Sequence, residues 1–309
     1  MTTLIFFTEP EAQSEGATIE TAILVDVVTT EKGTYAPTIV ATGTVQPVED
    51  VILSPLVPGQ IVRRDPAFIP GGFVQKGEVL LQIDPSDYRN TLELRKIDAH
   101  ILSQNVTVGS QVSQGDDLGR IVGTDSYWVL ATVPVSRLQW LKFPESEEEK
   151  GSMVRIENPS AWPSGAHREG YLDRQIGALD NQTRLARVLV RVDDPLATSD
   201  ELQGAPKLMI GTFVEVNIQA DSIPNVVRLD RDLIRSNQTA WVMKDNLLEI
   251  RELDIILTDN QHAYIKSGLE DGDKVVSTNL STVTNGVELR TRSEETSDNE
   301  DDENREDEG

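Results

Sequence analysis

The chain has 309 residues, a formal net charge of −24 and no cysteine. The lack of cysteine excludes disulfides, thiolate nucleophiles and cysteine metal sites. The negative charge disfavours nucleic acid as a partner, because an acidic protein repels phosphate backbones. Hydrophobic residues make up 38% of the chain and the mean hydropathy is −0.31, as in soluble proteins of about two or three domains.

Residues 1–18 are interpreted as an N-terminal linker. Their apolar run, Leu4–Phe7, has neither the basic region nor the small-residue cleavage site of an intact signal peptide. It is either a floppy terminus or the remnant of a membrane anchor, and composition does not decide between the two. From Ala22 onward, β-branched residues dominate the runs 23–28 and 38–45, which predicts strands.

The most informative feature is an internal repeat within residues 51–83 and 98–122. Five positions in the two copies are all 38 residues apart: Gly71, Val74, Gly77, Leu80 and Ile83 match Gly109, Val112, Gly115, Leu118 and Ile121. Five matches at one offset make a coincidence of common β residues a poor explanation.

Each copy of the repeat follows the same physical plan. Its second glycine, Gly77 or Gly115, follows the short valine strand and turns the chain, which requires a positive φ that glycine adopts at little cost. The leucine and isoleucine that follow point into the interior. Neither half can bury its apolar face alone, so the two halves are expected to face each other in a single sandwich.

The pattern Gly-x-x-Val-x-x-Gly-x-x-Leu-x-x-Ile in two swapped halves resembles the lipoyl/biotinyl-type barrel-sandwich hybrid. Neighbouring motifs narrow the resemblance: Gly43–Pro47, Pro58–Val62, Val74–Leu80 and Ile83–Tyr88 are similar to those of periplasmic adaptors of resistance-nodulation-division (RND) efflux pumps. These adaptors are the membrane fusion proteins of the HlyD-like superfamily. The resemblance extends to about Thr291 and leaves out only the two tails.

The chain departs from that family at one place. Family members insert a long antiparallel helical hairpin between the lipoyl half-motifs, whereas only residues 85–97 separate them here. Asp84 is a suitable N-cap and Pro85 a suitable first helical residue, so a short helix stub is predicted over 85–97. There are too few residues for two helices and a turn.

Beyond the repeat, short strands punctuated by Gly, Pro and Asp predict two further β units. The expected fold is mainly β: a lipoyl-like barrel-sandwich hybrid, a small β-barrel and a membrane-proximal β domain in series. The expected boundaries are 47–125 for the lipoyl-like domain, 126–220 for the barrel, 19–46 plus 221–292 for the membrane-proximal domain and 293–309 for an acidic tail. The barrel strands are expected at 152–156, 168–176, 184–192 and 211–218, and helical spacing is seen at 135–141.

The tail 293–309 holds ten acidic residues and one arginine, and nothing apolar. Such a segment cannot bury a core and is expected to be disordered. It is either an interaction tail or a solvated tail, and the second is favoured.

No nucleotide-binding loop or hydrolase motif is present, and no cofactor is expected. The histidines, His100, His167 and His262, lie far apart and have no metal-ligand spacing, so they predict no metal site. Lys96 lies where a carrier protein places its modified lysine, but a solvated lysine at a helix end is the better interpretation. The four tryptophans, at 128, 140, 162 and 241, favour core packing over a binding patch.

The resemblance implies an adaptor, not an enzyme, in the periplasm and associated with the inner membrane. Its partner would be an RND-type inner-membrane transporter, together with a full-length partner adaptor or further copies of the chain. Contact with an outer-membrane channel is doubtful without a hairpin. Two alternatives stay open: a carrier modified at Lys96, and a stand-alone periplasmic ligand-binding or regulatory module.

Overall fold

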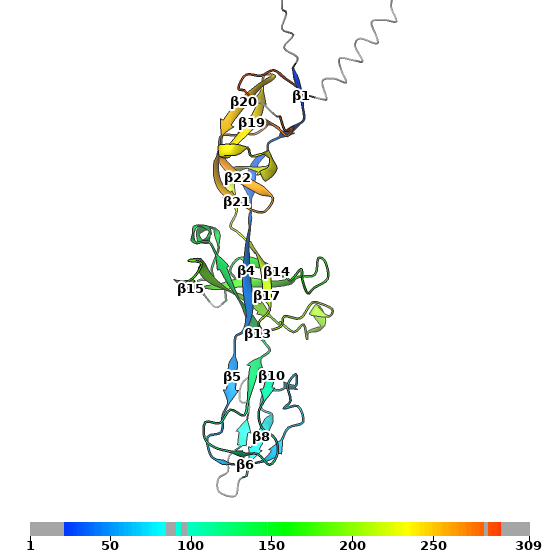
Figure 1. The fold of residues 1–309 in the computed structure, drawn as a ribbon, viewed down its shortest axis with the longest axis vertical. Coiled ribbons are helices and arrows are strands. Elements are labelled where there is room, and N and C mark those ends of the chain that lie inside the picture. Colours follow the sequence, from blue (N-terminus) through cyan, green and yellow to red (C-terminus); the bar gives the residue numbers. More distant parts are fainter. Residues whose placement is uncertain (1–21, 85–90, 94–97, 147, 281–283, 292–309) are drawn as a thin grey trace, which may run out of the picture. The chain divides into compact units, whose positions relative to one another are not determined.

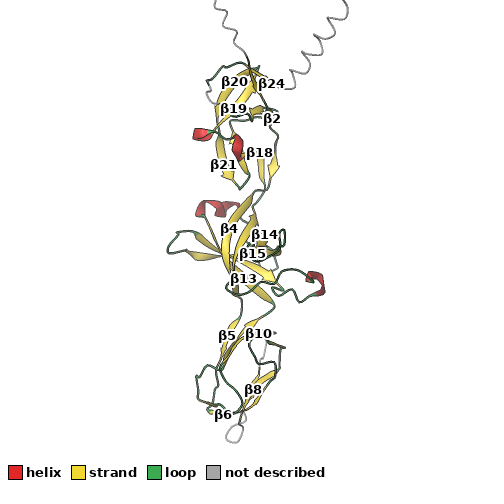
Figure 2. Cartoon of the chain, turned by 45° about the vertical axis from the view of Figure 1, so that its right-hand side comes forward, coloured by secondary structure: helices red, strands yellow, loops and turns green. Residues whose placement is uncertain are grey.

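The computed structural model describes residues 22–84, 91–93, 98–146, 148–280 and 284–291. These residues form three β units (Figure 1), and their few helical segments are short 3₁₀ turns (Figure 2). None of the described helices is long and apolar enough to cross a membrane. The predicted mainly β fold is confirmed.

The lipoyl-like domain consists of two four-stranded sheets, ordered β5-β12-β10-β7 and β11-β6-β8-β9. Its strands are β5 (Asp50–Leu53), β6 (Gly59–Arg64), β7 (Phe73–Val74), β8 (Val79–Ile83), β9 (Thr91–Glu93), β10 (Ala99–Gln104), β11 (Gln111–Val112) and β12 (Gly119–Gly123). The short strand β7 of the first half pairs with β10 of the second, and β11 of the second half pairs with β6 of the first. The two halves therefore exchange their valine strands.

The exchange is held by two matching sets of backbone hydrogen bonds. In one set, the Gly71 amide donates to the Ile101 carbonyl at 2.9 Å, and the Ile101 amide donates to the Gly72 carbonyl at 2.9 Å. In the other, the Gly109 amide donates to the Ile61 carbonyl at 2.8 Å, and the Ile61 amide donates to the Ser110 carbonyl at 2.9 Å. The opening strand of each half thus satisfies the glycine loop of the other.

The apolar repeat residues lie in the core of this domain. Val74, Leu80, Ile83 and their partners Val112, Leu118 and Ile121 all belong to one buried cluster. The turning glycines Gly77 and Gly115 both have φ near +87°. Each turn is also closed by a carboxylate that accepts a backbone amide: Glu78 from Gln75 at 2.9 Å, and Asp116 from Ser113 at 2.7 Å.

The helix stub predicted over 85–97 is wrong where the structure describes that segment. Residues 91–93 form strand β9, which pairs antiparallel with β8; residues 85–90 and 94–97 lie outside the described residues. The physical reason is that a helix this short is marginal in water, whereas the edge of β8 offers ready backbone partners.

The second unit is a closed six-stranded barrel, ordered β13-β16-β15-β14-β17-β4. Its strands are β4 (Thr38–Pro47), β13 (Ser126–Val133), β14 (Met153–Glu157), β15 (Arg168–Leu179), β16 (Ala186–Asp193) and β17 (Phe213–Gln219); the predicted helical segment is the 3₁₀ turn Val135–Trp140, and a second 3₁₀ turn covers Asp200–Leu202. Alternate residues of these strands point inward, as Tyr127, Val129, Ala131 and Val133 of β13 illustrate.

One predicted boundary needs correction. The sequence predicts that residues 38–46 belong to the membrane-proximal domain, but β4 pairs with β13 on one side and with β17 on the other, so it closes the barrel. The alternation of Ile39, Ala41 and Val45 supplies one inward face, which an isolated sequence window cannot attribute to one sheet over another.

The third unit contains both the first and the last described strands. It has two four-stranded sheets, β21-β22-β18-β3 and β2-β23-β19-β20, and the parallel pair β1-β24. The strands are β1 (Ile23–Val25), β2 (Val27–Thr29), β3 (Lys32–Tyr35), β18 (Ile223–Asp230), β19 (Thr239–Lys244), β20 (Leu247–Glu252), β21 (Asp254–Thr258), β22 (His262–Ser267), β23 (Lys274–Val276) and β24 (Leu289–Thr291); 3₁₀ turns cover Arg231–Leu233 and Ser236–Gln238. The β19–β20 hairpin turns at Asp245 and Asn246, both with positive φ, as a type I′ turn requires.

We expect Gly77→Ala to destabilise the lipoyl-like domain by about 1 kcal/mol, because an L residue at that positive φ is strained although the added Cβ meets no atom within 4 Å. Gly177→Ala is the matched control, since Gly177 has equally open space without a positive φ. Hydrogen exchange of amides in β6, β8 and β10 measures the effect. Equal protection in the two variants would contradict the assignment of Gly77 as an obligatory turn residue.

Candidate interaction surfaces

Large exposed apolar side chains concentrate on the lipoyl-like domain, which carries Val51, Ile52, Leu56, Val62, Ile69, Phe73 and Val108. On the sheet that contains β10, Phe73, His100, Val122 and Asp50 form one row of cross-strand neighbours. The Phe73 and His100 rings stack with centroids 4.8 Å apart, while Phe73 stays 55% exposed. Val122 of this row is buried, so Phe73 is its exposed apolar side chain, and an exposed aromatic ring is suited to contact with another protein.

An ion pair closes the far end of this row. The Arg120 guanidinium donates from two nitrogens to the Asp50 carboxylate, so β12 is joined to β5 by side chains as well as by backbone. The Arg120 hydrogen bonds hold the pKa of Asp50 below its usual value, against the smaller opposing effect of burial. The pair is exposed, so its contribution to stability is small.

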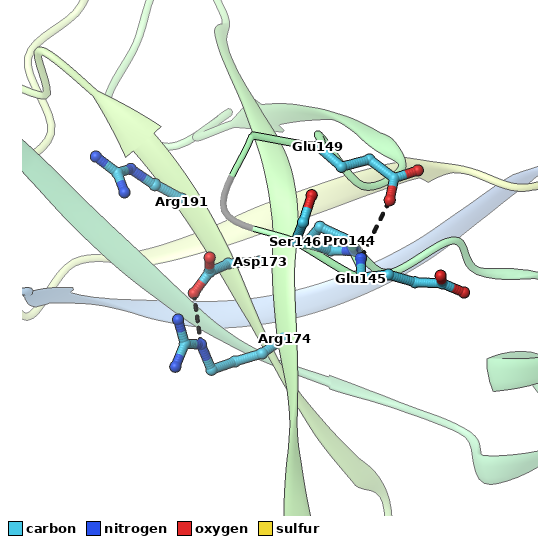
Figure 3. A pocket seen from close by; sticks show the side chains of 7 residues that line it. All are labelled: Pro144, Glu145, Ser146, Glu149, Asp173, Arg174 and Arg191. Carbon is cyan, nitrogen blue, oxygen red and sulfur yellow. Dashed lines mark hydrogen bonds and ion pairs between the residues drawn. The ribbon is translucent and has the colours of Figure 1, made fainter.

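A polar hollow of about 580 Å³ lies on the barrel between the segment 144–149 and strands β15 and β16 (Figure 3). Its charged groups are Glu145, Glu149, Asp173, Arg174 and Arg191. Most of these groups already form ion pairs. Arg174 pairs with Asp173 at 2.8 Å, Arg191 with Asp193 at 2.9 Å and Glu149 with Lys142 at 2.7 Å.

The hollow has no arrangement for nucleophilic catalysis. Ser146 is its only hydroxyl among the described lining residues, and no histidine is among them to act as a base. The hydrogen bond from Lys142 and that from the Glu145 amide lower the pKa of Glu149, so this carboxyl is a poor proton donor at neutral pH. The site is a surface for polar contacts.

Arg168 is the main organiser of the loop that follows β16. Its side chain is buried and donates to four backbone carbonyls, those of Asp193 at 3.2 Å, Asp194 at 2.6 Å, Pro195 at 3.0 Å and Pro206 at 3.0 Å. Burial lowers the pKa of Arg168, and the nearby Asp194 charge partly offsets this. One guanidinium thus ties both ends of the segment 193–206 to the start of β15.

The Asp194 carboxylate shapes the same loop from the other side. It accepts the Thr198 amide and hydroxyl at 2.9 and 2.8 Å and the Ser199 amide at 2.9 Å. Burial alone would raise the pKa of Asp194, but these hydrogen bonds outweigh it and hold the pKa at about 2. The loop leads to two exposed apolar residues, Met209 just before β17 and Phe213 at its start.

In the third unit, polar groups hold strands together. Arg235 lies over the Trp241 ring at 4.3 Å and donates to the carbonyls of Val276, Ser277 and Thr278. The Tyr264 hydroxyl donates to Asp259 at 2.6 Å, and burial together with this bond raises the pKa of Tyr264. These contacts staple the ends of sheets and form no site for chemistry.

The residues that the sequence analysis singled out lie in separate parts of the molecule. The repeat residues lie in the core and the turns of the lipoyl-like domain, and Lys96 lies outside the described residues. His100 lies in β10, His167 just before β15 and His262 at the start of β22. Nδ1 of His167 is 3.1 Å from the Gly165 carbonyl oxygen, and the ring of His262 lies 3.4 to 3.7 Å from the Asp230 and Asp259 carboxylates. No group of three or more potential metal ligands occurs within the described residues. Trp140 and Trp162 pack against the barrel core, and Trp241 packs in the third unit.

Sequence reasoning missed Arg168 and Asp194. A single arginine in a strand gives no sign of burial, because arginine is almost always exposed. For Asp194, the spacing of an aspartate followed by Thr198 and Ser199 is a usable turn signal.

No family model matches the chain. Among curated proteins, the toluene efflux pump periplasmic linker protein TtgA of Pseudomonas putida is 26% identical over 224 residues, covering 70% of this chain and 56% of that protein. The multidrug resistance protein MdtA of Klebsiella pneumoniae is 23% identical over 199 residues, covering 62% and 45%. The chain therefore spans about half the length of the curated relatives it matches.

Solved structures share the fold. MacA from Actinobacillus actinomycetemcomitans aligns with a TM-score of 0.57 at 15% identity, covering 83% of this chain and all of that one. A MacA–MexA chimeric protein with the Pseudomonas aeruginosa MexA α-hairpin domain aligns with a TM-score of 0.54 at 17% identity, covering 80% and 98%.

We expect Arg168→Met to destabilise the barrel by about 3 kcal/mol, because it removes the hydrogen bonds that a buried guanidinium donates to four loop carbonyls. Arg168→Lys should lose less, since an ammonium keeps three donors. The exposed Arg155→Met is the control, with an expected change within about 0.5 kcal/mol. Urea unfolding monitored by hydrogen exchange in β15 and β16 measures the differences; a neutral Arg168→Met would contradict the organising role.

Asp194 gives a pH dependence whose sign follows from its lowered pKa. Its stabilising effect is fully present above the usual value of 3.8 and is lost as the pH falls through about 2. The stability advantage of the wild type over Asp194→Asn should therefore be constant above about pH 5 and shrink between about pH 4 and pH 2. Thermal melts of both proteins across this range test it, and an advantage that does not depend on pH would refute it.

Proposed function

We propose that this chain, a membrane fusion protein homologous to the periplasmic linkers of efflux pumps, serves as an adaptor subunit of an RND-type efflux transporter. It would act by holding a pump together and not by catalysis. It would work in the periplasm, associated with the inner membrane. The relatives that the chain matches are named as linkers and resistance proteins, and none is named as an enzyme.

One observation carries the proposal: a strand-swapped lipoyl-like domain is followed by a closed barrel and a β unit that takes up the N-terminal strands. Each of these units alone is compatible with many functions. Their succession lies within a chain of which 70% aligns with a periplasmic linker protein.

The barrel and the third unit are proposed to face the transporter. On the barrel, the apolar residues Met209 and Phe213 are 66% and 65% exposed, beside a loop that Arg168 and Asp194 hold in place. Exposed aromatic and methionine side chains on a rigid support are typical anchors of protein interfaces.

The chain is proposed not to reach an outer-membrane channel by itself. Only residues 85–97 separate the two lipoyl halves, and β9 occupies part of that interval. A full-length partner adaptor would supply the missing reach, and further copies of the chain would assemble beside it. The exposed Phe73 ring on the lipoyl-like domain, stacked on His100, is suited to such lateral contacts.

Two alternatives predict different results. A carrier protein would be modified at Lys96, which intact-mass measurement after native expression detects directly. A stand-alone ligand-binding module would show melting shifts with small molecules and no association with a transporter. No specific contact among the described residues favours either one.

The proposal is tested by co-purification of the tagged full chain with an RND-type transporter from its source organism. Met209→Ser combined with Phe213→Ser should reduce recovery of the transporter about tenfold. Ile52→Ser combined with Leu56→Ser, similarly exposed residues on the lipoyl-like domain, is the matched control and should keep recovery unchanged. Absence of any association with the wild-type chain would count decisively against an adaptor role.

A further inference from the structure

Met209 is the most exposed methionine among the described residues. Its side chain is 66% exposed, whereas Met153 on β14 is 44% exposed and Met243 on β19 is buried at 6%. Methionine is oxidised at its thioether sulfur, so an oxidant in solution has to reach that atom. Of these three methionines, Met209 therefore offers its sulfur most readily.

A tight turn of the backbone holds Met209 in this exposed position. The Thr212 amide donates to the Met209 carbonyl at 3.1 Å, and Gly211 in this turn has a φ of +83°, as the third residue of a type II turn does. The Gly211 amide donates to the Val45 carbonyl at 2.8 Å, and the Val45 amide donates to the Thr212 carbonyl at 2.9 Å. The turn is thus tied to β4, and the exposure of Met209 is built into the fold.

The residues on both sides of Met209 are anchored in the barrel. Leu208 is part of the buried barrel core, and its amide donates to the Pro195 carbonyl at 2.8 Å. Ile210 packs against the same core. The Pro195 carbonyl also accepts from the buried Arg168 at 3.0 Å. Met209 stands between two inward-packed neighbours as the side chain of this segment that is presented to solvent.

We propose that Met209 is a sulfoxidation site and that its oxidation by hydrogen peroxide weakens binding of this chain to its transporter. The inference rests on the proposed function, in which Met209 and Phe213 contact that partner. In the reaction, the sulfur attacks one peroxide oxygen with an electron pair, an S–O bond forms and the O–O bond breaks. The sulfur is oxidised, and the other oxygen leaves with both protons as water.

Oxidation changes the polarity of the surface at one point. Phe213 stays apolar and 65% exposed at the start of β17, whereas the oxidised Met209 side chain carries a polar oxygen that accepts hydrogen bonds. Burying such an oxygen at an interface without a donor weakens binding. Methionine sulfoxide is reduced again by two enzymes, one for each sulfoxide epimer, so the change is reversible.

The first arm of the experiment maps the modification. The purified full chain is treated with hydrogen peroxide, the reaction is stopped with catalase, and peptides are analysed by mass spectrometry over time. We expect Met209 to be oxidised first and Met243 at least about tenfold more slowly than Met209, because its sulfur is buried. Oxidation of Met153 or Met243 ahead of Met209 would overturn the assignment of the site.

The second arm measures binding after the peroxide has been removed. The treated chain is mixed with the solubilised RND-type transporter of its source organism, and recovery should fall about fivefold below that of untreated chain. Met209→Leu, which keeps an apolar side chain of similar volume, should bind equally well before and after treatment. Met153→Leu is the matched control and should lose as much binding as the wild type.

The sulfoxide reductases supply a test that needs no variant. Incubation of the treated wild-type chain with both enzymes should restore recovery of the transporter. Undiminished recovery while the mass spectrum shows Met209 oxidised, or an equal loss in Met209→Leu, would refute the effect on binding. If untreated wild-type chain recovers no transporter, the adaptor role fails and the effect on binding fails with it, whereas the order of oxidation still decides whether Met209 is the modified residue.

Discussion

The exchange of two short strands in the lipoyl-like domain is the constraint on which the recognisable part of this molecule depends. Each half of the repeat has too few strands to cover its own apolar face, and each supplies the other with a strand centred on a valine, β7 for β10 and β11 for β6. Because the bonds from Gly71 and Gly109 run between halves and not within them, neither half is complete without the other. The two halves are therefore expected to fold together, and the spacing and glycines that both copies share serve this exchange.

The barrel solves a different problem, which is how to support an irregular loop on a regular sheet. In the closed barrel every strand pairs with two neighbours. The chain between β16 and β17 lies outside this hydrogen-bonded ring, so its backbone groups need other partners. Besides its backbone hydrogen bonds, the loop is held by one buried arginine, Arg168, which donates to its carbonyls, and by one aspartate, Asp194, which accepts from its amides. Both are charge-assisted contacts, which are stronger and more directional than neutral ones. The rigid loop this produces is what allows Met209 and Phe213 to stand exposed beside the start of β17.

The sequence predicted features that depend on periodicity and turn chemistry. The 38-residue offset identified Val74, Leu80, Ile83, Val112, Leu118 and Ile121 as core residues, although not Ile61, Phe68 or Ile101 of the same cluster. Short β-rich runs between turn residues located the barrel strands to within a few residues. Prediction from the sequence failed where contacts with distant parts of the chain decide the local structure. Residues 91–93 have a weak local preference, and the open edge of β8 made them a strand instead of a helix. A strand is correctly predicted over residues 38–45, but its domain is wrong. Alternation shows which side of a strand is buried; it does not show which strands pair with it. Burial of Arg168 had no local signature at all.

The proposed surface-based function is supported by what the polar groups of this chain do. In each β unit, the strongest polar contacts are satisfied internally: Glu78 and Asp116 close turns, Arg168 and Asp194 hold a loop, and Arg235 staples strand ends. Catalysis needs the opposite, polar groups held near a cavity with hydrogen-bonding capacity left over for a substrate. What the described residues leave over is exposed apolar surface, on the lipoyl-like domain and around the start of β17. Such surface is a means of binding other chains.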